Sequence, residues 1–195
     1  MEKIRRVSIF FKMMFRIMFI AMPIVLVMSW IYAPDQLLLF SGIINWNAIP
    51  ANYSGMHTYT TAGISEKSIM HTLTVGEKTL GCLVSSIPMM VYLFILAMLI
   101  KLFSCYEKGE IFSINNIRYI RNIGYALLVS QIIEPIYQFI MGFVLTIHNP
   151  PHHHFASITL DQTNIGILLT ALLVILISWI MMEAYQLREE QQLTI

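Results

Sequence analysis

The chain has 195 residues, of which 57% are hydrophobic and only 12% are charged, and its formal net charge is +1. Soluble domains carry about twice this share of charged residues, so the composition excludes an ordinary soluble domain and indicates an integral membrane protein. The near-neutral total also argues against direct nucleic-acid binding, which requires a concentrated basic face.

Four long apolar stretches predict four transmembrane helices, at about residues 8–32, 79–103, 123–147 and 165–185. Each has the roughly 20 residues that cross about 30 Å of hydrocarbon. The first stretch follows a basic head, like a secretory signal, but it is too long for one and lacks a cleavage site, so we expect an uncleaved anchor. The predicted fold class is all-α: a four-helix transmembrane bundle forming one membrane domain over residues 1–195.

The positions of the basic residues predict the orientation. Ten of the 12 Lys and Arg residues fall on one side of the spans, namely Lys3, Arg5, Arg6, Lys12, Arg16, Lys101, Lys108, Arg118, Arg121 and Arg188. Only Lys67 and Lys78 fall on the other side. Because basic residues concentrate in cytoplasmic segments, we expect both termini to be cytoplasmic.

The connections differ in character. The outer loop of about residues 33–78 is polar and too short for an independent core. On the inner side, Ser113 is a predicted N-cap of a helix that continues into the third span, and a turn at Gly109 separates it from the second span. We call residues 104–122 and 186–195 the predicted cytoplasmic stub.

Glu134 is the most unusual residue, because it is ionisable and near the middle of the third span. Gln131 and Gln138 lie three residues before it and four after it, so the three form a polar stripe on one helix face. Such a stripe should face the bundle interior. It is either part of a proton, ion or ligand pathway, or a polar clamp between helices beside the kink expected at Pro135; we favour the clamp.

A second candidate is the histidine run of the second outer loop, made of His148, His152, His153 and His154. Imidazoles at this density can bind zinc, copper or nickel, and Asp161 could add a carboxylate. The run lacks the spacing of a structural zinc site, so a polar loop is the alternative that we favour. Cys82 and Cys105 are expected on one helix, about 34 Å apart, which excludes a disulfide between them.

No Ser-His-Asp grouping, phosphate-binding glycine loop or HExxH motif occurs in the sequence. We therefore predict a protein that is not an enzyme and uses no cofactor.

Two stretches look familiar together: Tyr106-Glu-Lys-Gly-Glu-Ile-Phe-Ser113, which leads to Ile123-Gly124, and the ending from Glu183 to Ile195. The chain resembles a bacterial family of four-span inner-membrane proteins of unknown function, the YoaS-like proteins, from about Leu73 onward. The resemblance implies a bacterial inner-membrane protein without known catalytic activity. Members of that family are often encoded beside a small helix-turn-helix regulator, which implies a soluble partner.

The interpretation that follows is a regulatory or scaffolding membrane protein that docks such a regulator, with a homo-oligomer as a further option. The candidate docking residues are the ionisable groups of the predicted cytoplasmic stub: Glu107, Glu110, Arg118, Arg121, Glu189 and Glu190. One alternative is proton or metal transport or sensing through Glu134 and the histidine run. Another is an immunity protein that blocks an envelope-targeting toxin through the outer loop.

Overall fold

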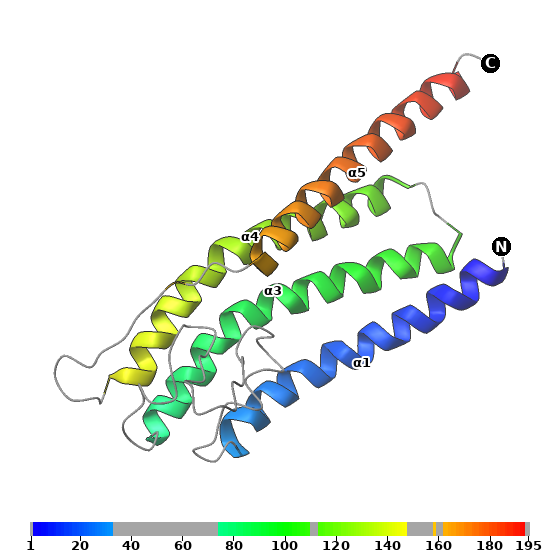
Figure 1. The fold of residues 1–195 in the computed structure, drawn as a ribbon. Helices are drawn as coiled ribbons and strands as arrows, with labels where there is room; N and C mark the ends of the chain where they lie inside the picture. Colours follow the sequence, from blue (N-terminus) through cyan, green and yellow to red (C-terminus); the bar gives the residue numbers. More distant parts are fainter. Residues whose placement is uncertain (1, 33–73, 110–112, 148–157, 159–161, 194–195) are drawn as a thin grey trace. The chain divides into compact units, whose positions relative to one another are not determined.

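The structure is a computed structural model that describes residues 2–32, 74–109, 113–147, 158 and 162–193. In these residues all regular structure is helical, and Figure 1 shows the helices α1 (Glu2–Tyr32), α3 (Val75–Glu107), α4 (Ile114–Thr146) and α5 (Gln162–Leu193). Each is long and apolar enough to cross a membrane. The predicted fold class, an all-helical bundle of four spans, is therefore confirmed for the described part of the chain.

The helices are longer than the spans that they contain. They have 31, 33, 33 and 32 residues, which corresponds to lengths of about 46–50 Å at 1.5 Å per residue. The hydrocarbon core of a bilayer is about 30 Å thick. Every helix must therefore extend into the headgroup layer or the water at one end or at both.

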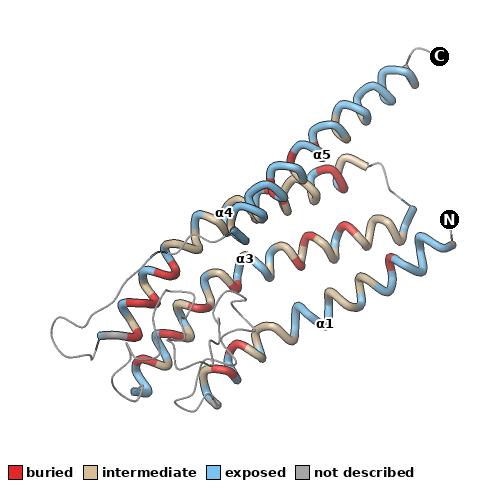
Figure 2. The backbone as a smooth tube through the Cα atoms, in the orientation of Figure 1, coloured by how far each residue is buried: buried red, intermediate tan, exposed pale blue. Residues whose placement is uncertain are grey.

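Large apolar side chains cover much of the exposed surface of the helices. Figure 2 shows that α5 is exposed over most of its length, and its buried residues are Ala171, Ile175 and Ser178. These residues are spaced by four and by three, so they form one narrow stripe along the helix. The remaining faces carry leucine, isoleucine and tryptophan, which suit contact with lipid tails.

The start of α3 is fixed by a capping box. The Thr74 hydroxyl lies 3.3 Å from the backbone nitrogen of Glu77, and the Glu77 carboxylate accepts hydrogen bonds from the backbone nitrogen of Thr74 at 2.7 Å and from its hydroxyl at 2.9 Å. This reciprocal arrangement satisfies helix donors that would otherwise lack partners. The helix therefore begins at Val75, a turn before the predicted span at residue 79.

The predicted turn and cap between α3 and α4 are confirmed. Gly109 has a φ of +82°, a conformation that side chains with a Cβ disfavour, and its nitrogen donates to the Tyr106 carbonyl at 3.1 Å. At the start of α4, the nitrogen of Asn116 lies 3.4 Å from the Ser113 hydroxyl, and that of Ile117 lies 3.3 Å from the Ser113 carbonyl. The sequence predicted both the turn and the cap because glycine favours positive φ and serine favours the N-cap position of a helix.

The chain divides into two compact units. The first consists of Met1–Ala21, Val91–Gln131 and Gln162–Ile195. Its described residues include the first part of α1, the last part of α3, the first part of α4 and all of α5. It therefore contains the described residues of the predicted cytoplasmic stub.

Within the first unit, two helix pairs are in close contact. The first part of α1 packs on the last part of α3 through Phe11, Phe15 and Phe103. In the second pair, α4 approaches α5 at Gly124, where an added Cβ would lie 2.6 Å from Ile175 Cγ1 and 3.3 Å from the Ala171 carbonyl oxygen. Only a residue without a side chain permits this approach.

The second unit consists of Met22–Met90 and Ile132–Asp161. Its core cluster comprises Tyr137, Met141 and Leu145 of α4, with Trp30 of α1 and Val84 of α3 packed against them. The Trp30 ring lies directly over Gly81, where an added Cβ would overlap the ring. Aromatic and aliphatic side chains from α1, α3 and α4 thus pack into one cluster within this unit.

Candidate functional site

An ion pair joins α1 to α3 at the end of the first unit. The Lys12 ammonium donates a hydrogen bond to the Glu107 carboxylate, and both side chains are largely shielded, with 16% and 28% of their surfaces exposed. Glu107 is the last residue of α3 and lies beyond the predicted span 79–103. The hydrogen bond from Lys12, helped by the charges of Lys12, Arg5 and Arg16, lowers the pKa of the Glu107 carboxyl. The carboxyl is therefore ionised at neutral pH.

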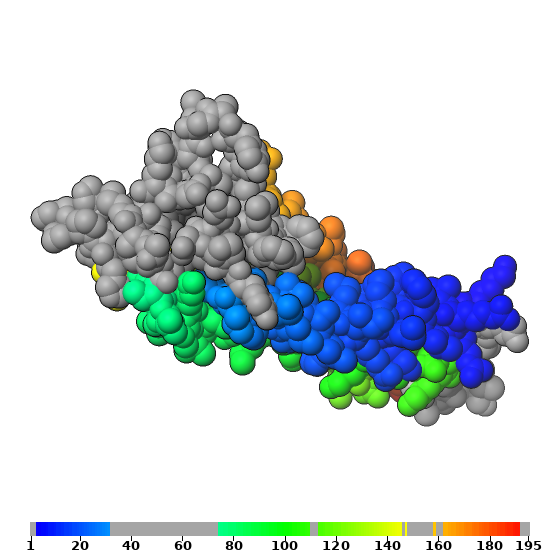
Figure 3. All heavy atoms as spheres, turned by 90° about the horizontal axis from the view of Figure 1, so that it is seen from below, coloured from blue at the N-terminus to red at the C-terminus, as the bar shows by residue number. Residues whose placement is uncertain are grey.

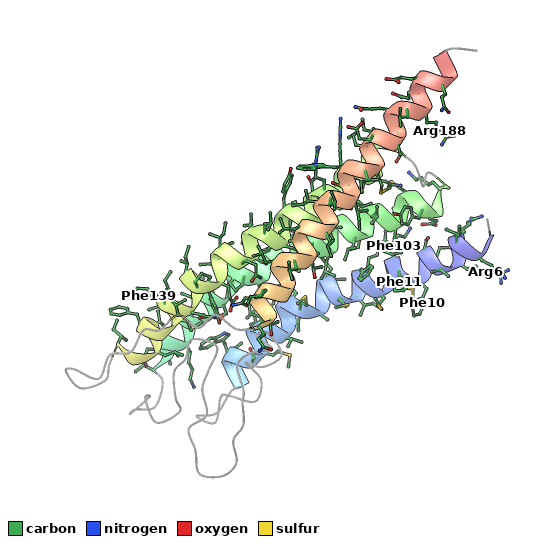
Figure 4. All side chains as sticks on the ribbon, turned by 45° about the horizontal axis from the view of Figure 1, so that its top comes forward. Arg6, Phe10, Phe11, Phe103, Phe139 and Arg188 are labelled. Atoms are coloured by element: carbon green, nitrogen blue, oxygen red, sulfur yellow. The ribbon has the colours of Figure 1, made fainter. Side chains whose placement is uncertain are left out.

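An aromatic cluster lies next to this ion pair. The Phe11 and Phe103 rings stack with centroids 5.3 Å apart, the centroid of Phe15 lies 5.6 Å from that of Phe103, and Tyr106 and Phe103 form a T-shaped pair with centroids 5.7 Å apart. Figure 4 shows Phe11 and Phe103 between α1 and α3. Such ring pairs contribute roughly 0.5–1.5 kcal/mol beyond the burial of their area. The cluster packs α1 against α3 in the register that places Lys12 beside Glu107.

The two candidate arginines of α4 have different surroundings. Arg118 is exposed, whereas its neighbour Ile117 is buried with 1% of its surface accessible. Arg121 is partly buried, and its Nε atom makes no hydrogen bond within the described part of the chain. Arg118 is therefore available to a partner, while Arg121 also belongs to the packing of the unit.

The acidic residues of the predicted cytoplasmic stub lie near the end of α5. Glu189 and Glu190 are exposed, and Glu189 accepts a hydrogen bond of 2.7 Å from the Tyr185 hydroxyl one turn earlier. Figure 4 shows Arg188 close to the end of this helix. Leu187 lies in the same segment with 58% of its surface exposed. This end of α5 thus presents charges of both signs around an exposed apolar residue.

The polar stripe lies on one continuous helix, as predicted. In the second unit, the Gln138 amide donates a hydrogen bond of 3.3 Å to the Glu134 carboxylate, and Gln138 is almost fully buried, with 2% of its surface exposed. In the first unit, the Gln131 amide donates to the hydroxyl of the adjacent Ser130 at 3.3 Å. The Glu134 and Gln138 side chains are therefore linked by a hydrogen bond along one face of α4. Helix α4 continues through Pro135.

Several predicted residues lie outside the described part of the chain. They are Glu110 of the predicted cytoplasmic stub, most of the predicted outer loop 33–78, and the histidine run with its neighbour Asp161, that is His148, His152, His153, His154 and Asp161. Metal binding by the histidines remains a prediction from sequence. Cys82 and Cys105 both lie on α3, as predicted, and neither forms a disulfide.

The ion pair and the Trp30 contact were not predicted. From the sequence, Glu107 was predicted only as a docking residue. In the structure its ion pair with Lys12 joins α3 to α1. The sequence carries no local signal for that pair, because it depends on how two distant helices align. The capping box is different, since Thr74 followed three residues later by Glu77 is a recognisable helix-start motif.

Comparison with known proteins identifies a family but no function. The model of a family described as "Protein of unknown function (DUF2975)" matches residues 49–195. The match starts earlier than the resemblance from about Leu73 suggested, and α1 lies outside it. No curated protein and no solved structure matches the chain. Because the matched region covers well over half of the sequence, this membrane protein belongs to the DUF2975 family.

Proposed function

We propose that the protein is a non-enzymatic regulatory or scaffolding component of the bacterial inner membrane that docks a small cytoplasmic helix-turn-helix regulator. The docking surface would be the predicted cytoplasmic stub in the first unit. The observation that carries the proposal is the exposed end of α5, where Leu187, Glu189 and Glu190 are all accessible. This segment extends beyond the predicted span 165–185 as a continuous helix.

The exposure and ion pairs of the charged residues in the stub indicate which of them could contact a partner. Arg118, Glu189 and Glu190 are exposed, so a partner can reach them. Glu107 is bound to Lys12 and is better assigned to holding α1 on α3. Exposed charges at an interface mainly set the association rate and the orientation of the partner. A regulator that meets this surface should therefore bind in a salt-dependent way.

The partner class comes from the resemblance to the YoaS-like proteins, whose members are often encoded beside a helix-turn-helix regulator. In this proposal, a DNA-binding regulator held at the membrane is kept away from its operator. A signal received by the membrane protein could then release the regulator. The basic-residue distribution supports a cytoplasmic position for the stub.

The experiment is co-purification of the intact protein, in detergent, with the regulator encoded beside its gene. Arg118→Glu is the principal variant because the side chain is exposed, whereas Arg121→Glu would place a carboxylate in a partly buried position. We expect Arg118→Glu, or deletion of residues 189–195, to weaken binding about tenfold, equal to about 1.4 kcal/mol.

The control is Lys78→Glu, the same charge reversal in the first turn of α3 and in the other unit, at a side chain that is partly buried. It should bind the regulator as the wild type does, and all variants should reach the membrane fraction in equal amounts. Failure of the intact protein to retain the regulator would refute the docking role. An equal loss in Lys78→Glu would show that binding depends on overall charge and not on the stub.

Transport is the second candidate, and one observation favours it. Glu134 lies within the predicted third span, and its carboxylate is hydrogen-bonded to the buried Gln138 amide. Ionisable groups inside membrane spans are costly and often serve proton or ion pathways. A path through four spans would need a dimer or larger assembly to enclose it. The Glu134→Gln variant considered below separates a transport role from a structural clamp.

A further inference from the structure

Helix α1 carries three basic residues on one face. Arg5, Lys12 and Arg16 are separated by seven and by four residues, which correspond to nearly whole numbers of turns, so their side chains point within about 40° of one another. We call these three residues the α1 basic stripe. Arg5 and Arg16 are exposed, and Lys12 is partly buried through its bond with Glu107.

The stripe carries more positive charge than its acidic neighbour can balance. Glu107 is bound by Lys12, and the charges of Arg5 and Arg16 reach it as well, since both help to keep its carboxyl ionised. One carboxylate beside three cations leaves two positive charges in excess. Glu107 holds the Lys12 ammonium in place before a ligand arrives.

The depth of the stripe corresponds to the lipid headgroups. Arg16 directly precedes the apolar core of the first span, which runs from Ile17 to Tyr32. Along the helix axis, Lys12 lies about 6 Å and Arg5 about 16 Å from Arg16. The headgroup layer on each side of a bilayer is roughly 5–7 Å thick. The long side chains of Lys12 and Arg16 can therefore reach the lipid phosphates, and Arg5 lies in the water beyond.

Apolar side chains on an adjacent face of α1 indicate a lipid and not a free ion. Phe10, Met13, Ile17 and Ile20 are spaced by three, four and three residues, and between 60% and 66% of each is exposed. Figure 3 shows that one side of the first part of α1 is open. A phospholipid bound here can place its phosphate at the stripe and its acyl chains along these residues.

We propose that the α1 basic stripe binds the headgroup of an anionic phospholipid, with the phosphate between Lys12 and Arg16 and with Arg5 adding longer-range attraction. The guanidinium of Arg16 can form two parallel hydrogen bonds with phosphate oxygens, which makes it the principal ligand. Lys12 is positioned by Glu107. This inference does not depend on the docking role, because it concerns the lipid boundary of α1.

The test uses the full-length protein, purified in detergent and depleted of lipid. Thermal unfolding is followed while phosphatidylglycerol, phosphatidylcholine with the same acyl chains, or inorganic phosphate is added. We expect phosphatidylglycerol alone to raise the melting temperature, and high salt to reduce the rise. Arg16→Gln should weaken the binding of phosphatidylglycerol about fivefold or more, as expected for the loss of one basic residue at an anionic surface.

Two matched controls remove a positive charge elsewhere. Lys3→Gln lies on the opposite face of α1, and Lys101→Gln lies on α3; both lysines are exposed. Neither should change the response to phosphatidylglycerol. Arg16→Lys keeps the charge and should retain part of the response, which guards against a folding defect in Arg16→Gln. An equal loss in Lys3→Gln, or an equal stabilisation by phosphatidylcholine or inorganic phosphate, would overturn the proposal.

Discussion

The indole ring of Trp30 lies so close to the backbone of Gly81 that no side chain can be accommodated there. The two residues belong to α1 and α3, and the same ring packs against the Tyr137, Met141 and Leu145 cluster of α4. Gly81 therefore lets Trp30 approach α3 while keeping its contacts with α4. A side chain at position 81 would force the ring out of this position.

We predict that Gly81→Ala destabilises the protein by about 1–3 kcal/mol, the usual cost of overpacking a well-filled site. The measurement is thermal unfolding in detergent. Gly76→Ala, in the same helix, is the control because the nearest atom to its Cβ would be the Thr74 hydroxyl at 3.9 Å. The double variant Gly81→Ala with Trp30→Phe should recover part of the loss. Wild-type stability in Gly81→Ala would contradict the contact.

A second prediction concerns the contact between α4 and α5. A Cβ at position 124 would lie 3.2 Å from the Ile175 nitrogen and 3.3 Å from the Ala171 carbonyl oxygen, and backbone atoms cannot move aside as a side chain can. Gly124→Ala should therefore lower the melting temperature, and Gly124→Leu should lower it further. Gly166→Ala is the control, because nothing lies within 4 Å of its added Cβ. Similar behaviour of the two alanine variants would refute the close approach.

The third prediction separates a clamp from a pathway at Glu134. Glu134→Gln keeps the shape and the hydrogen-bonding ability of the side chain but removes its charge. A clamp with Gln138 should tolerate the change at a cost of about 1 kcal/mol, as for other hydrogen bonds inside membranes. We expect this result in thermal unfolding, with unchanged proton and metal uptake by proteoliposomes. A variant that folds normally but loses an uptake activity of the wild type would establish the transport alternative.

The orientation can be tested independently of any function. Reporter fusions after Leu193 and within residues 107–111 should give a cytoplasmic signal, and fusions within residues 52–77 an external one. The expectation follows from the ten basic residues on one side of the spans and the two on the other. A cytoplasmic signal from residues 52–77 would overturn the orientation and, with it, the docking proposal.

The sequence was sufficient for features that depend on local chemistry. Apolar runs gave the four helices, Ser113 gave the start of α4, and Gly109 gave the turn before it. Each of these depends on residues within a few positions of one another. Helix α3 begins at Val75, a turn before the predicted span, and the Thr74–Glu77 capping box that sets this start was not predicted.

Contacts between helices could not be predicted in the same way. The periodicity of a helix shows which residues share a face, but it does not show which residue of another helix they meet. Lys12 and Glu107 are 95 residues apart in the chain, and nothing in either segment identifies the other as its partner. The same holds for Trp30 and Gly81. For this reason the candidate docking set contained Glu107, which the structure assigns to an ion pair.

The separation of Lys12 and Glu107 along the chain has a consequence for biosynthesis. The ribosome makes Lys12 well before Glu107, because 95 residues separate the two. Helix α1 must therefore enter the membrane while its future counter-ion has not yet been synthesised. Lys12 and Arg16 both precede the apolar core that begins at Ile17. Until Glu107 is made, water and lipid headgroups can therefore solvate their positive charges. Once α3 has been synthesised, Glu107 can form its ion pair with Lys12 and join the two helices.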